Sequence, residues 1–113
     1  MGVVELYLTT TQARPGLAPR IHSYPAGAPW VCLYLVYAGA RPGADHYTYR
    51  FVQGRDVIFR DVDRTVPAPH GAALDCFPTG GGLAPGQYVA ELLVNGREVR
   101  RIPLVVAPPI KRL

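Results

Sequence analysis

The segment 87–106, QYVAELLVNGREVRRIPLVV, decides the fold. In its first half every second residue from Tyr88 onward is apolar, which is the alternation of a β-strand with one buried face. Asn95 and Gly96 follow and form the strongest short signal for a type I′ hairpin turn, because both residue types tolerate positive φ. The segment therefore predicts two antiparallel strands joined by a tight turn. Pro103 cannot donate to a sheet ladder, so we expect the second strand at an edge or a bulge.

The rest of the chain contains further strand-like segments, each bounded by glycine or proline. The sequence has 12 glycines and 12 prolines and shows no helical periodicity, which is typical of short antiparallel strands joined by turns. The segments lie at 3–8, 20–24, 30–37, 46–52, 57–60 and 72–77. Together with the hairpin they predict an all-β antiparallel sandwich of about 7–8 strands.

Two of these segments have a clearly predicted face. Alternation places Tyr47, Tyr49 and Phe51 together on one side of their strand. The same reasoning groups Val4 with the next two alternate residues on one face of the strand 3–8, which we expect at a sheet edge.

Length and composition fit one small globular domain. Of the 113 residues, 49% are hydrophobic and 18% charged, a balance that supports a packed core. We expect residues 1–106 to form a single domain and 107–113 a C-terminal tail or linker stub. The segment 30–37 predicts a central strand covered on both faces, and it is too short to cross a bilayer. The first ten residues lack the features of a signal peptide, so the chain fits a cytosolic protein or an excised piece of a larger exported one.

Five phrases stand out in order along the chain. They are Pro25-Ala26-Gly27, Val31–Tyr37, Tyr47–Phe51 with its following hairpin, Leu83-x-Pro-Gly86-x-Tyr88, and Val94-Asn95-Gly96-Arg97-x-Val99. Together they resemble the immunoglobulin-like domains of bacterial extracytoplasmic proteins. The resemblance implies an immunoglobulin-like antiparallel β-sandwich and a secreted or cell-surface location, with a cytoplasmic location left open.

Three positions take a structural meaning from this resemblance. Tyr88 matches the tyrosine corner, in which the hydroxyl bonds back to the backbone. Ala90 stands where antibody-type domains carry their second core cysteine, and Phe51 stands where their core tryptophan is expected. The antibody-type disulfide between the sheets is therefore missing, which places the chain with looser, disulfide-independent members.

The chemistry-bearing residues are few. Cys32 and Cys76 lie on strands that would be neighbours in such a sheet. We interpret them as two buried small hydrophobic residues, with a cross-strand disulfide as the alternative left open. Asp61 and Asp63 could bind Ca²⁺, but interleaved arginines favour ion pairs instead. The histidines are isolated and predict no metal site; they are His22, His46 and His70.

Nothing in the sequence indicates catalysis or a cofactor. It contains no nucleophile elbow, and its three consecutive glycines do not open a helix and so do not form a phosphate cradle. We therefore expect a non-catalytic protein.

The basic residues supply the remaining signal. The formal net charge is +4 and eleven of the twelve basic residues are arginine. They are scattered, which favours a solvated basic surface, and the candidate binding residues among them are Arg50, Arg60, Arg100 and Arg101. We expect a protein-interaction or spacer module of a bacterial cell-surface or secreted assembly, able to self-associate through its sheet edges. Carbohydrate binding through exposed aromatic rings is the alternative, and nucleic-acid binding through arginines ranks third.

Overall fold

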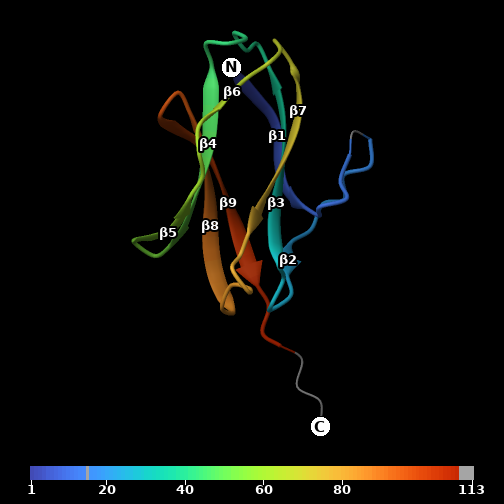
Figure 1. The fold of residues 1–113 in the computed structure, drawn as a ribbon, viewed down its shortest axis with the longest axis vertical. Coiled ribbons are helices and arrows are strands. Elements are labelled where there is room, and N and C mark those ends of the chain that lie inside the picture. The colour runs from blue at the N-terminus through green and yellow to red at the C-terminus, as the bar shows by residue number, and fades with distance from the viewer. Residues whose placement is uncertain (15, 110–113) are drawn as a thin grey trace.

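The computed structural model describes residues 1–14 and 16–109, and within them the chain is all-β with no helix. The strands are β1 (Gly2–Thr9), β2 (Ser23–Tyr24), β3 (Trp30–Ala38), β4 (His46–Gln53), β5 (Asp56–Arg60), β6 (Arg64–Thr65), β7 (Gly71–Pro78), β8 (Gly86–Val94) and β9 (Arg97–Val106). Figure 1 shows them in two facing layers. The predicted all-β sandwich is confirmed. The predicted segment 20–24 is shortened to β2, and the short strand β6, which was not predicted, brings the number to nine.

The two sheets have a simple order. One is β1-β3-β7, and the other is β2-β9-β8-β4-β5, with β6 pairing β4. The pairs are antiparallel except β2 with β9, which is parallel. The run β9-β8-β4-β5 has the order of the larger sheet in variable-type immunoglobulin sandwiches. The described residues contain no helix long and apolar enough to cross a membrane.

Alternate side chains from both sheets fill the space between the layers. Leu33 and Leu35 of β3 are fully buried there, and so are Tyr49 of β4 and Leu92 of β8. The predicted inward row on β4 is confirmed, because Tyr47, Tyr49 and Phe51 all belong to the core. β3 also proves central, with β1 and β7 on its two sides.

The predicted face of β1 is wrong at one position. The register between β1 and β3 shifts between Val3 and Glu5, and Val4 in this bulge is 58% exposed. A bulge inserts one unpaired residue and so reverses the alternation on one side of it. Val3 therefore takes the inward place that alternation assigns to Val4, while Leu6 and Leu8 face the core as expected.

The last hairpin matches its prediction closely. Asn95 has φ 51° and Gly96 has φ 81°, the positive values that a type I′ turn needs at both positions. The Tyr88 hydroxyl donates to the Ala84 carbonyl oxygen at 2.6 Å, which confirms the tyrosine corner. Pro103 lies in β9, which pairs with β8 along its length but with β2 only at its last two residues. β9 is thus an edge strand at Pro103, as expected.

The interpretation of two separate thiols is wrong. Cys32 on β3 and Cys76 on β7 lie directly opposite one another with a Cα–Cα distance of 4.1 Å, and they form a disulfide. The bond joins two strands of one sheet, unlike the inter-sheet bond of antibody domains, and Ala90 is buried without a sulfur partner. The cause is the register, which places the two residues in a closely spaced antiparallel pair. Phe51 is buried in the core, as the resemblance implies.

The hydroxyl of Tyr24 ties the two layers together at one end. Tyr24 sits on β2, which pairs with β9 of the larger sheet. Its hydroxyl donates to the Thr9 carbonyl at 2.6 Å and accepts from the Cys32 amide at 2.9 Å. Both of these residues belong to the smaller sheet, so this buried side chain bridges the layers. The predicted tail follows β9, and its residues 110–113 lie outside the described range.

Two tyrosine-to-phenylalanine changes test the assigned hydroxyls. Tyr88→Phe deletes the corner hydrogen bond and should lower the free energy of unfolding by about 1 kcal/mol. Tyr49→Phe removes a buried hydroxyl to which no described group bonds, so stability should stay constant or rise. Urea unfolding of both variants measures the difference. Equal losses, or the reverse order, would contradict the assignment.

Candidate functional site

Charged side chains form a row across the outer face of the larger sheet. Pairing places Arg60 of β5 opposite Arg50 of β4, Arg50 opposite Glu91 of β8, and Glu91 opposite Arg101 of β9. Arg50 Nε donates to one Glu91 oxygen at 2.6 Å, and Arg101 Nη2 donates to the other at 2.9 Å. Glu91 is only 4% exposed, so its carboxylate holds two guanidinium groups in fixed positions.

Beside this row the sheet is hollowed. The hollow has a volume of about 650 Å³ and lies over β4, β5, β8 and β9. We name it the arginine–valine face after the side chains that line it, chiefly Arg50, Arg55, Arg101, Val57, Val89 and Val105. Val57 is 47% exposed and Val105 is 36% exposed. Apolar surface ringed by charged groups is the arrangement found at protein-binding sites.

The structure gathers some of the predicted arginines and separates others. Arg50, Arg60 and Arg101 share the outer face of the larger sheet. Arg100 does not join them, because its side chain turns toward β1 and donates to the Val3 carbonyl at 3.3 Å. A register shift in the β8–β9 hairpin, between Leu92 and Leu93, lies beside this position.

Sequence reasoning missed two parts of the face. The valines were not selected, although Val89 and Glu91 occupy the outward positions of a strand whose inward positions were assigned. Glu91 was also missed as the anchor of two arginines. Both could have been predicted from the alternation of the strand 87–94, because assigning its inward residues also fixes which residues point outward.

The carboxylates considered for Ca²⁺ are held by basic groups. Asp61 accepts from Arg64 Nε at 3.0 Å, and Asp63 contacts His46 Nδ1 at 3.1 Å. The expected pairing with an arginine holds for Asp61, whereas the partner of Asp63 is a histidine. Across the described ranges, 1–14 and 16–109, no group of three or more His, Cys, Asp or Glu side chains is arranged to hold a metal ion.

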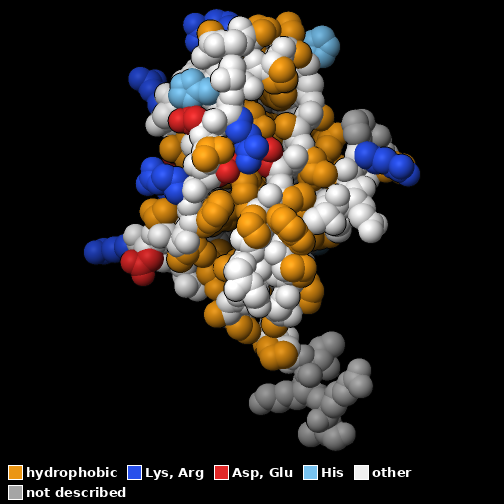
Figure 2. Space-filling view, in the orientation of Figure 1, with side chains coloured by type: hydrophobic (Ala, Val, Ile, Leu, Met, Phe, Trp, Pro, Cys, Tyr) orange, Lys and Arg blue, Asp and Glu red, His pale blue; other side chains and the backbone are white. Residues whose placement is uncertain are grey.

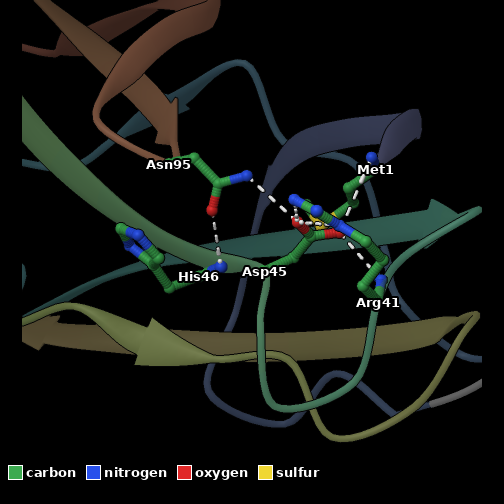
Figure 3. Close-up of polar contacts among 5 residues, drawn as sticks. All are labelled: Met1, Arg41, Asp45, His46 and Asn95. Atoms are coloured by element: carbon green, nitrogen blue, oxygen red, sulfur yellow. Dashed lines mark hydrogen bonds and ion pairs between the residues drawn. The ribbon is translucent and has the colours of Figure 1, made fainter.

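A second polar cluster surrounds Asp45 at the end of the sandwich (Figure 3). The Asp45 carboxylate, 1% exposed, accepts from the Arg41 backbone amide at 2.8 Å and from its guanidinium at 2.8 Å. Asn95 Nδ2 donates to the same carboxylate at 3.0 Å, while its Oδ1 accepts from the His46 amide at 3.0 Å. The amino group of Met1 lies 3.8 Å away. The cluster fixes the β8–β9 turn against the start of β4.

The hydrogen bonds from Arg41 are the largest influence on Asp45, and they hold the pKa of its carboxyl well below the ordinary value of 3.8. The described partners of this carboxylate are Arg41, Asn95 and the amino group of Met1, which link a loop, a turn and the chain start. The geometry therefore indicates a structural anchor and not a reactive acid.

A third cluster lies between the sheets. The Tyr47 hydroxyl donates to Asp75 Oδ2 at 2.8 Å, and Arg64 Nε is 3.4 Å from the other Asp75 oxygen. Burial raises the pKa of Asp75, although Tyr47 and Arg64 oppose the shift. Burial also raises the pKa of the Tyr47 hydroxyl. This carboxylate is turned inward from β7 and is not presented to solvent.

Comparisons with known proteins add a fold-level likeness. No family model matches the chain, and no curated protein matches it. Among solved structures, the alkylpurine DNA glycosylase AlkC of Pseudomonas fluorescens, bound to DNA containing an abasic site analog, matches with a TM-score of 0.50 and 15% identity. The likeness covers 92% of this chain and 31% of that chain, so the sandwich spans under a third of the similar protein.

The Asp45 cluster predicts a specific dependence of stability on pH. Because its native pKa is lowered, Asp45 contributes stability that is complete above its unfolded pKa, near 3.8, and is lost as pH falls through the native value. Asp45→Asn should lower stability at pH 7 and flatten the loss of stability on acidification. Thermal unfolding at a series of pH values measures both effects.

Asp56 supplies the matched control for this change. It is an exposed carboxylate on β5 without an ion pair among the described residues. Asp56→Asn should leave the acid limb of the stability curve unchanged. An unaltered acid limb in Asp45→Asn would contradict the anchoring role.

Proposed function

We propose that this chain is a non-catalytic protein-interaction module that binds its partner through the arginine–valine face. The observation that carries the proposal is the pair of exposed valines, Val57 and Val105, in a hollow bordered by Arg50 and Arg101. Arginine is enriched at protein interfaces and a central apolar area is typical of their cores. Glu91 already fixes both guanidinium groups, so little side-chain entropy remains to be lost on binding.

The charge balance of the face favours a protein over a polyanion. Four arginines lie on or beside it: Arg50, Arg55 and Arg101 line the hollow, and Arg60 pairs with Arg50. Three carboxylates accompany them, since Glu91 lines the hollow, Glu98 is ion-paired with Arg101 and Asp56 adjoins Arg55, which leaves one net positive charge. Nucleic-acid binding draws its affinity from many unneutralised basic groups. The DNA held by the structurally similar glycosylase therefore supports this alternative only weakly.

Carbohydrate binding remains the other alternative. The arginine–valine face offers no exposed aromatic ring for a sugar to stack on, since Tyr88 at its border is 5% exposed. The exposed ring of Trp30, 44% accessible, lies beside a different hollow with Ser23 and Thr10. A single ring supports this reading less than the valine and arginine array supports a protein partner.

The disulfide bears on where such a module would work. Disulfides form and persist in oxidising compartments, and a bond between Cys32 and Cys76 joins two strands of the smaller sheet. We therefore propose an extracytoplasmic setting, as a module of a secreted or cell-surface assembly. The bacterial origin implied by the resemblance stays a prediction.

Site-specific photo-crosslinking tests the proposed binding face. A photoreactive side chain at Val57 should give a discrete cross-linked polypeptide in cells that produce the protein. The same group at Val4, 58% exposed on the opposite sheet, should not. Val57→Asp should then weaken binding to the captured polypeptide at least about tenfold, because it places a charged group in the apolar centre of the face and binding must remove its water.

Two outcomes would overturn the proposal. One is equal cross-linking from both positions, which would show no preference for the face. The other is strong binding to duplex DNA that falls steeply with salt and is lost in Arg50→Ala, which would favour the nucleic-acid alternative.

A further inference from the structure

The outer edge of β7 carries unpaired backbone groups. β7 ends the order β1-β3-β7, so among the described residues only its inner side pairs. Both backbone groups of Cys32 contact the Tyr24 hydroxyl, on the side away from β7. The pair Cys32–Cys76 is therefore a non-hydrogen-bonded pair, and the amide and carbonyl of Cys76 point to the free edge. Because every second residue of a strand directs its backbone groups to the same side, the amides and carbonyls of Ala72 and Leu74 also point to the free edge.

The other sheet edges are protected in ways that β7 is not. β1 has the bulge at Val4, and its Val3 carbonyl accepts from Arg100. β9 carries Pro103 and is covered at its end by β2. β5 is only five residues long and its pairing with β4 is shifted. β7 is eight residues long and keeps a regular register with β3 along its length. Long, regular edge strands without a bulge or a proline in the paired segment recruit further strands.

Apart from Arg64 of β6, which is ion-paired with Asp61 and Asp75, the side chains around this edge are apolar or turned inward. The single charged residue of β7, Asp75, points to the core and accepts from Tyr47. An apolar slot of about 100 Å³ opens beside the end of β7, lined by Phe59, Phe77, Leu83 and the 41% exposed Ile58 among others. Figure 2 views the molecule onto this edge and shows hydrophobic side chains gathered over its lower half.

We propose that a second copy of this chain pairs here, β7 against β7 in antiparallel orientation about Leu74. Only residues whose amide and carbonyl point to the free edge can form hydrogen-bonded pairs with a partner strand. A two-fold axis at Leu74 uses all three such residues, Ala72, Leu74 and Cys76. Ala72 then faces the partner's Cys76, and Leu74 faces Leu74. Pro78, which has no amide proton, stays outside the paired segment.

Charge and size favour a second copy in this register. The inward Asp75 of each strand lies opposite the partner's Ala73, so no like charges meet. Phe77 lies opposite the partner's Gly71, so a large side chain meets a residue without one and the two do not clash. The joined sheet would be a continuous six-stranded layer, β1-β3-β7 and its two-fold mate, which is the isologous contact of a symmetric dimer. No residue of β7 lines the arginine–valine face, so the two proposals rest on different residues and can fail independently.

A charge-swap experiment tests the register directly. Leu74 is half-buried on the outer face of the smaller sheet, opposite Tyr34, and no described residue bonds to its amide. Sedimentation equilibrium up to about 1 mM should show dimer for the natural chain and monomer for Leu74→Lys and for Leu74→Glu alone. An equimolar mixture of the two variants should restore the dimer, because opposite charges then face each other.

Val99→Lys is the matched control, since Val99 is 44% exposed on β9 and should not affect dimerisation. Thermal unfolding of each variant checks that the fold is kept. A monomeric natural chain at all concentrations would overturn the proposal, and so would dimers in both single variants. A mixture that stays monomeric would reject the two-fold about Leu74.

Discussion

The contact between the aromatic row of β4 and Phe77 of β7 determines how the two layers face each other. Phe77 lies 5.3 Å from Phe51 and 5.6 Å from Tyr49, measured between ring centroids, in edge-to-face geometry. Phe59 of β5 joins the same cluster at 5.5 Å from Phe77. Burial of each ring contributes roughly 1.5–3 kcal/mol, and each such aromatic pair roughly 0.5–1.5 kcal/mol more. Since these rings come from both sheets, the cluster fixes β7 opposite β4.

Several features follow once β7 is held there. Its alternate residues must face outward, which puts Cys76 on the outer face of the smaller sheet, where the register with β3 brings it opposite Cys32. On β4 the same alternation turns Arg50 away from the core and onto the outer face, where Glu91 meets it. The packed interior and the arginine–valine face are thus the two sides of one alternating pattern with a period of two. The ion pairs around Glu91 add order to a face that would otherwise carry long mobile side chains.

Local signals in the sequence were enough to predict the local structure. The Asn95-Gly96 turn, the Tyr88 corner and the inward row on β4 each depend on residues close together in the chain. The misjudged features are non-local. The Cys32–Cys76 bond depends on the register of two strands 44 residues apart, and no pattern within either strand specifies it. The bulge at Val4 likewise depends on pairing with β3. Arg100 does not lie with the other predicted arginines because its side chain bonds to Val3 of β1, and these two residues are 97 positions apart in the sequence.

The placement of β7 as an edge strand packed on β4 is the central claim, and amide hydrogen exchange measured by NMR tests it most directly. In dilute, monomeric protein the amides of Ala73, Asp75 and Phe77, bonded to β3, should exchange slowly. Those of Ala72 and Leu74 should exchange rapidly because their donors face solvent. Uniformly slow exchange along β7 in the monomer would show that a strand of the same chain covers its outer side, and uniformly rapid exchange would show that it does not pair with β3. Either result would contradict this account.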